Sequence, residues 1–226
     1  MKHLVTVGCS FSDIMRCDGQ LWPTFLSKEL NHNLHSHGKS GMGNYYISTT
    51  TIQEVQELLN EGIDEKDILV GVQWSGVLRR DIFENLEWKP DPRRQMVEMN
   101  FFLSLPFLDR ILNNTLLKKV DLNLIDYYVR TLQAILLTQC YLESKNIKYF
   151  MFSMNEIFIS DILENSYLHN LSLQINRNKW LPCKGMFEWC FNKLPDPKDM
   201  HPSSEQNLEF TKQVIIPWLK ENYDCF

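Results

Sequence analysis

The stretch from Asp67 to Trp74 constrains the fold more than any other part of the sequence. It reads DILVGVQW, an apolar run preceded by charged residues and followed by Ser75 and Gly76. A run of this kind is typical of a strand that is buried on both faces, as the strands of parallel sheets are. The stretch therefore predicts a core strand of a parallel sheet.

Strand and helix patterns alternate along the rest of the chain. Strand-like runs lie at 3–7, around 34, 67–74 and 147–152, and helical spacing of apolar residues is found at 22–30, 45–60, 122–145 and 203–221. Because this alternation is typical of parallel sheets covered on both faces, we expect an α/β fold with three layers, α/β/α, around a mostly parallel central sheet.

The totals indicate one domain, spanning residues 1–226. A chain of 226 residues that is 44% hydrophobic can bury a substantial core without disulfides or metals. Residues from about 80 to 120 contain several prolines and aromatics without a clear period. We expect an insertion there, over one face of the sheet, that could act as a lid.

Charge and targeting signals exclude several classes of function. The formal net charge of −5 gives no positive field for nucleic acid or an anionic membrane. The N-terminal apolar run is too short for a signal peptide and no segment is long enough to span a bilayer, so we expect a cytoplasmic protein. The six cysteines show no CxxC spacing, which predicts reduced thiols.

Candidate chemistry lies where the strands end, since ligands of open parallel sheets bind beyond the carboxyl ends of the strands. The polar residues that follow the first three strands, and those before the last helix, are Ser10; Gly41 and Asn44; Gln73 and Ser75; and Asp199 and His201. Acyl transfer needs such a set: a serine nucleophile, a histidine to take its proton, a carboxylate to orient the histidine and donors for the oxyanion.

Three short segments resemble the sequence blocks of the SGNH/GDSL hydrolases. Gly8-Cys9-Ser10-Phe11-Ser12 is similar to the first block, GDSxS, and Ser40-Gly41-Met42-Gly43-Asn44 is similar to the second. His201-Pro202 before a helix resembles the last block. Cys9 in place of the usual aspartate, together with a later Trp-Pro pair, resembles divergent, phage-encoded members that begin GCSF.

The resemblance implies a flavodoxin-like sheet order and hydrolysis of an ester or acetyl ester through an acyl-serine. Ser10 would be the nucleophile and His201 the base. The acid usually found three positions before this histidine is replaced by a lysine, so Asp199 is our candidate for the orienting carboxylate, with Asp196 as the alternative. No cofactor is required, and the expected substrate is a small-molecule or glycan ester, with O-acetylated sugars as the natural subclass.

The resemblance also implies donors for the oxyanion. These would be the amides of Ser10 and Gly41, with Gln73 or Ser75 in place of the asparagine that usually ends the third block. Because the third and last blocks differ from the pattern, a binding module without catalysis is a second hypothesis. An acyl or glycan transferase that uses the same serine, with water excluded by the 80–120 insertion, is a third.

Several residues have both a functional and a structural interpretation. Cys9 could be a nucleophile, but a buried structural cysteine is favoured because adjacent residues point to opposite sides. Asn44, Trp74 and Arg79 are candidate substrate contacts; Trp74 could equally be core, and Arg79 or its neighbour Arg80 could be surface residues. His32, His35 and His37 could hold a metal, yet without acidic or cysteine partners in the polar loop they favour a solvated loop, and we assign no metal.

Overall fold

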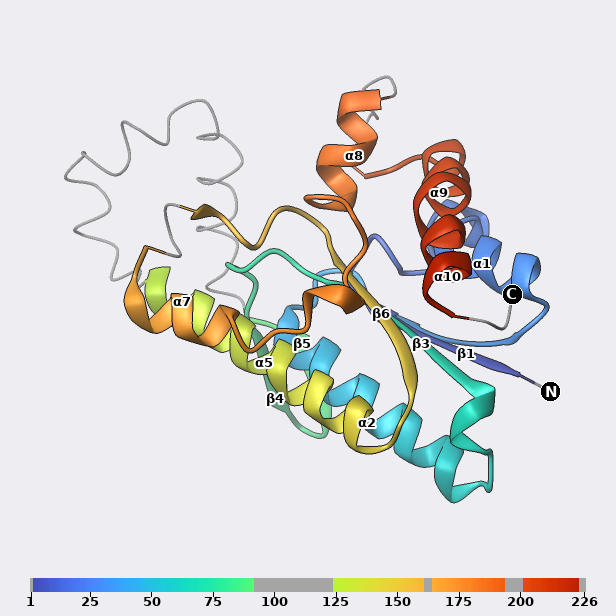
Figure 1. Cartoon of the computed structure of the whole chain (residues 1–226), viewed down its shortest axis with the longest axis horizontal. Helices are drawn as coiled ribbons and strands as arrows, with labels where there is room; N and C mark the ends of the chain where they lie inside the picture. The colour runs from blue at the N-terminus through green and yellow to red at the C-terminus, as the bar shows by residue number, and fades with distance from the viewer. Residues whose placement is uncertain (1, 92–123, 161–163, 194–200, 224–226) are drawn as a thin grey trace.

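A computed structural model describes residues 2–91, 124–160, 164–193 and 201–223 of the chain. Its central sheet contains four parallel strands, in the order β2-β1-β3-β6 (Figure 1). The strands are β1 (His3–Gly8), β2 (Asn33–Gly38), β3 (Ile68–Trp74) and β6 (Lys148–Ser153). This confirms the predicted α/β fold with a mostly parallel sheet, and the strand order is that of the first four strands of a flavodoxin-like sheet.

Helices cover both faces of the sheet (Figure 1). One face is covered by α2 (Asn44–Asn60) and α5 (Leu124–Ser144), and α7 (Ser166–Ser172) packs against α5. The opposite face is covered by α1 (Trp22–Leu30), α8 (Met186–Lys193), α9 (Ser204–Phe210) and α10 (Ile216–Asn222). Short 3-10 turns lie at η1 (Cys17–Gly19), η2 (Glu65–Asp67) and η5 (Arg177–Lys179).

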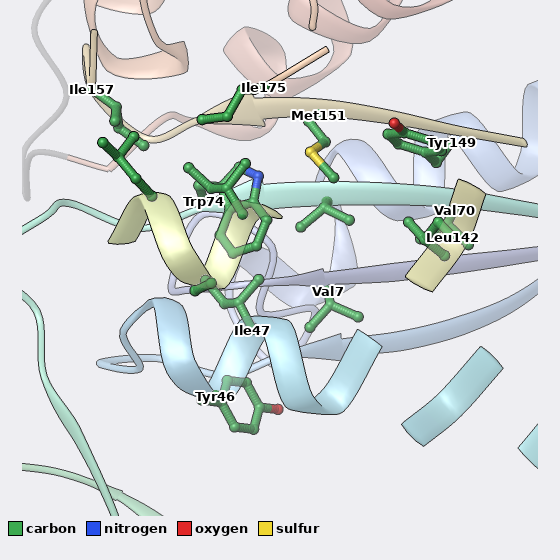
Figure 2. Close-up of a cluster of buried hydrophobic side chains, with 14 of the residues drawn as sticks. Val7, Tyr46, Ile47, Val70, Trp74, Leu142, Tyr149, Met151, Ile157 and Ile175 are labelled. Carbon is green, nitrogen blue, oxygen red and sulfur yellow. The ribbon is translucent and has the colours of Figure 1, made fainter. Parts of the chain in front are cut away.

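The alternation of side chains along each strand divides the core into two layers. In β6, Tyr149 and Met151 face α2 and α5, and Phe150 and Phe152 face the opposite helices. Figure 2 shows the first layer, in which Tyr149 and Met151 lie with Trp74. Both layers are buried, which explains why β1, β3 and β6 read as apolar runs, whereas the edge strand β2 is polar and only partly buried.

The end of the chain differs from the single helix predicted at 203–221. α9 and α10 are separated by a π-helical segment, η6 (Thr211–Ile215). Pro217 is the cause, since a proline has no N–H to donate to the carbonyl of Gln213 and its ring crowds that turn.

The 80–120 region begins with a hairpin that the sequence did not suggest. β4 (Asp81–Glu84) pairs antiparallel with β5 (Glu87–Pro90) across a two-residue turn. Asn85 and Leu86 have φ of 52° and 63°, as a type I′ turn requires. Leucine is rare at such a position, so the usual signal was missing; residues 92–123, and with them most of the predicted lid, lie outside the described residues.

On the outer side of β6, the segment around Trp180 pairs with the sheet through a single bridge. Met151 and Trp180 form an isolated parallel bridge, and the Leu181 amide donates to the Met151 carbonyl at 2.9 Å.

Within the part of the chain that the structure describes, no helix is both long and apolar enough to cross a membrane.

Candidate active site

The turn that contains Ser10 follows β1 at the carboxyl edge of the sheet. The Ser12 amide donates to the Cys9 carbonyl at 2.9 Å, which closes a tight turn with Ser10 at its tip. A side chain at Gly8 would not fit, because a Cβ there would lie 2.4 Å from Ser12 Oγ. The glycine therefore permits the serine turn to fold back onto the strand end.

Ser10 and His201 are far apart in the sequence but adjacent in the structure. Ser10 Oγ lies 2.9 Å from His201 Nε2, and the serine is only 5% exposed. His201 directly precedes the N-terminus of α9, where Ser203 and Gln206 form a reciprocal capping box. The Phe11 ring packs beside the imidazole at a centroid distance of 5.4 Å. A fixed helix start and an aromatic neighbour thus hold the histidine at the serine.

A buried hydrogen-bond network supports the turn from below. Gln73 Oε1 accepts from the Cys9 amide at 3.1 Å and from Ser12 Oγ at 3.1 Å. Ser12 Oγ in turn accepts from Trp22 Nε1 at 2.9 Å, and Gln73 Nε2 donates to the Trp74 carbonyl at 2.7 Å. Gln73 therefore braces the serine turn through its carboxamide oxygen, while one N–H of its Nε2 is used by the Trp74 carbonyl.

The glycine loop after β2 is tied to the same turn. The Lys39 amide donates to the Gly8 carbonyl at 3.1 Å, and Met42 donates to Lys39 at 3.2 Å, so residues 39–42 form a β-turn. Gly41 has φ of 86°, which L side chains rarely adopt. Asp13 holds the loop through Ser40, accepting its amide at 2.9 Å and its hydroxyl at 2.6 Å.

Asp13 was not predicted from the sequence, because an acid three residues after the serine resembles an ordinary turn residue. Its position beside the Ser40 loop becomes visible only in three dimensions. A weak signal was available, since aspartate readily accepts backbone N–H groups in loops.

Asn44 and Ser75 are linked to each other. The Ser75 amide donates to Asn44 Oδ1 at 2.8 Å, while Asn44 Nδ2 donates to the Ser75 carbonyl at 3.2 Å and to Thr131 Oγ1 at 3.1 Å. Asn44 thereby joins the start of α2 to the end of β3 and to α5. Ser75 is fully buried, and its hydroxyl has no hydrogen-bond partner among the described residues.

The remaining sequence candidates fall into different places. Trp74 is fully buried in the core layer below α2 and α5 (Figure 2), so it is not positioned to contact a substrate. The Cys9 thiol is also buried, 3.3 Å from Gln73 Oε1 and 3.9 Å from Met154 Sδ. These contacts favour the structural interpretation of Cys9. Asp199 and the alternative Asp196 lie outside the described residues.

Two of the three histidines of the β2 region contact a carboxylate instead of lying in a solvated loop. Glu54 Oε1 lies 3.2 Å from His35 Nδ1, and Oε2 lies 2.9 Å from His37 Nε2. His35 also contacts His3, whose pKa is lowered by burial and by the neighbouring imidazole. No cluster of three or more histidine, cysteine or acidic side chains suited to a metal ion is found in residues that the structure describes.

A cavity of about 270 Å³ opens beside the glycine loop. Its lining combines three arginines and one aspartate with four aromatic side chains and three others: Arg79, Arg80, Arg130 and Asp81; Tyr45, Phe83, Trp88 and Tyr127; Asn44, Val77 and Thr131. β1 and β3 are adjacent and parallel, so the segment after β3 reaches the cavity from the sheet edge that carries Ser10. Arg79 and Asn44, which the sequence suggested as substrate contacts, both line this cavity.

The fold is similar to that of a solved structure of the G-D-S-L family. Among solved structures, it is similar to a protein from Desulfitobacterium hafniense DCB-2 that is described as a lipolytic protein of the G-D-S-L family. The match has a TM-score of 0.51 and 10% sequence identity, and it covers 99% of this chain and 100% of the other. No protein-family model matches the sequence, and no curated protein matches it. The likeness is therefore one of fold.

Proposed function

We propose that the chain is a serine esterase that hydrolyses acetyl or other short acyl esters through an acyl-serine. The observation that carries this proposal is the 2.9 Å contact between Ser10 Oγ and His201 Nε2. This is hydrogen-bond distance between a nucleophile and a base, at the sheet edge where open α/β folds bind ligands. The GDSL-type fold supports the same chemistry by analogy.

In the first half-reaction, Ser10 Oγ attacks the carbonyl carbon of the ester while His201 Nε2 accepts the hydroxyl proton. The tetrahedral intermediate collapses as the imidazolium returns that proton to the leaving alcohol, which leaves an acyl-serine. Water then attacks the acyl carbon, His201 takes its proton, and the acid is released with the serine restored. In this proposal Asp199 orients the imidazole.

The oxyanion would be stabilised by the backbone amides of Ser10 and Gly41. Two observations support Gly41: its positive φ and the bonds that fix its loop to the serine turn. Loss of one such donor costs on the order of 10²–10³ in turnover in serine hydrolases. Ser75, whose hydroxyl is buried without a partner among the described residues, is the third candidate donor.

The test is hydrolysis of 4-nitrophenyl acetate by the wild type, Ser10→Ala and His201→Ala, combined with fluorophosphonate labelling and peptide mass spectrometry. We expect both variants to lose at least about 10³-fold in kcat/KM and the label to map to the peptide that contains Ser10. Ser36→Ala is the matched control, because the hydroxyl it removes is buried without a described partner. Full activity in folded Ser10→Ala would refute the proposal.

The same experiment separates the two alternative functions. A folded wild type that neither turns over esters nor takes the label would favour the binding module. Transfer of the acetyl group to an added alcohol in preference to water would favour the transferase.

A further inference from the structure

The cavity beside the glycine loop has an excess of positive charge. Three arginines and a single acid, Asp81, line it. Asp81 is already engaged, since its carboxylate accepts the Gly43 amide and, at 3.0 Å, the Tyr46 amide. The negative charge is therefore held against the N-terminus of α2, where the helix dipole favours it.

Arg130 retains donors that can reach a ligand. Its Nε donates to Asp126 Oδ2 at 2.8 Å, and the two side chains are 52% and 39% exposed. A pair this exposed is weak, and it uses only one of the five N–H groups of a guanidinium. Arg80 lies with its Cζ 5.7 Å from the centre of the Tyr127 ring, which holds it at the same wall.

The rest of the lining offers flat apolar surfaces. Trp88 is the centre of the aromatic group, with Phe83 at 5.1 Å and Tyr45 at 6.2 Å between ring centroids. Tyr45 and Phe83 are more than half exposed, which is unusual for aromatic side chains unless they meet a ligand or partner. Arginines beside such rings suit a planar or cyclic ligand that carries an anionic group.

The cavity adjoins the candidate catalytic loop. Asn44 lines the cavity, follows the Gly41 turn by two residues and is bonded to Ser75 at the end of β3. A ligand in the cavity would consequently lie next to the loop that carries the proposed oxyanion donor.

We propose that this cavity selects esters whose leaving alcohol carries a carboxylate or phosphate on a ring. The proposal rests on the proposed function for its catalytic readout and adds a substrate class to it. Arg80 and Arg130 bind the anion, and the aromatic wall around Trp88 contacts the ring.

The test compares 4-acetoxybenzoate with its neutral analogue 4-acetoxybenzamide in the wild type, Arg80→Gln, Arg130→Gln and the double variant. We expect the wild type to prefer the anion by at least about 10-fold in kcat/KM and the double variant to lose that preference while it hydrolyses the amide analogue normally. Comparison of 4-acetoxyphenyl phosphate with 4-acetoxybenzoate shows whether the cavity prefers a phosphate or a carboxylate. Lys220→Gln, which removes an exposed cation from α10, should retain the preference.

A second measurement separates failure of this proposal from failure of the esterase. This measurement is an NMR titration of the Ser10→Ala variant with 4-hydroxybenzoate, and it does not depend on catalysis. We expect saturable chemical-shift changes, and an affinity for 4-hydroxybenzoate that falls at least about 5-fold when Arg130→Gln is added to Ser10→Ala. Equal kcat/KM for anionic and neutral esters, or, if no ester is hydrolysed, absence of this arginine-dependent binding, would overturn the proposal.

Discussion

A single oxygen of Asp13, Oδ2, accepts both the amide and the hydroxyl of Ser40, at 2.9 Å and 2.6 Å. These bonds join the serine turn after β1 to the glycine loop after β2. The two loops that carry the proposed oxyanion donors are thus linked by one carboxylate.

Replacing Asp13 with alanine should lower turnover more than substrate affinity. Without the carboxylate, the Gly41 amide loses its fixed position, and we expect kcat to fall about 10–100-fold with little change in KM. Ser40→Ala keeps the amide bond and should lose less than about 5-fold. Wild-type kcat in a folded Asp13→Ala protein would contradict this role.

Gly38→Ala should destabilise the fold and distort the site. The new Cβ would lie 2.0 Å from the Ser12 carbonyl oxygen, a backbone atom that no rotamer change can move. We expect a loss of at least about 2–3 kcal/mol in urea unfolding. Gly62→Ala meets nothing within 4 Å and carries only the strain of its φ of 86°, so it should lose about 1 kcal/mol. Equal losses in both variants would contradict this prediction, because they would show that the contact with Ser12 costs no more than the strain at Gly62.

Cys9→Ser should keep ester hydrolysis within about 3-fold of the wild type. The buried thiol contacts Gln73 and Met154, and a serine hydroxyl can make the same bond to the Gln73 carboxamide oxygen. Iodoacetamide should modify the exposed Cys140 in the native protein and leave Cys9 unmodified. Loss of activity and of fluorophosphonate labelling in Cys9→Ser, with Ser10 intact, would support the thiol as nucleophile.

Glu188→Gln should stabilise the protein near neutral pH. Burial raises the pKa of this carboxyl above its ordinary value of 4.5, although the Glu156 amide, which donates to Oε1 at 3.0 Å, acts in the opposite direction. A raised pKa means that the folded state disfavours the charged form, so the penalty is absent below the ordinary value and complete above the raised one. We expect a Tm about 2 °C higher at pH 7.5 and no difference at pH 4.

Matched thermal scans of the two proteins at these pH values check the prediction. Because the glutamine retains the acceptor for the Glu156 amide, a lower Tm at both pH values would show that the charge itself is stabilising.

The fold could be predicted well where burial alone determines the pattern. β3 and β6 are buried on both faces, and their apolar runs predicted them to within a residue or two. The β4–β5 hairpin was missed because Leu86 occupies a turn position that glycine or asparagine normally fills. The π-helical segment before Pro217 was missed because its cause is a local conflict that apolar spacing does not record.

Some residues of the candidate site could also be predicted from the sequence, and others could not. Ser10 and Gly41 were predicted because a strand end and a glycine loop are recognisable in the sequence, and His201 because it precedes a proline and the start of the last helix. Asp13 was not predicted, since it acts through a contact with Ser40 in another loop, and Arg130 was not, since most of the other residues that line its cavity are far from it in the sequence. Gln73 was predicted as a donor, and its three acceptor contacts with Cys9 and Ser12 become evident only when β1 and β3 are side by side.

β1 is paired with β2 along all of its residues and with β3 from His3 to Val7. Because β1 is hydrogen-bonded to a strand on each side, neither side is open to solvent. We therefore expect its amides to exchange with solvent only in the least frequent, most extensive openings of the molecule. The Cys9 amide, bonded to Gln73, extends that slow-exchanging segment to the residue before Ser10. In kinetic terms, Ser10, the proposed nucleophile, directly follows a segment that we expect to be among the last to open, so local openings elsewhere in the protein should leave the serine in place.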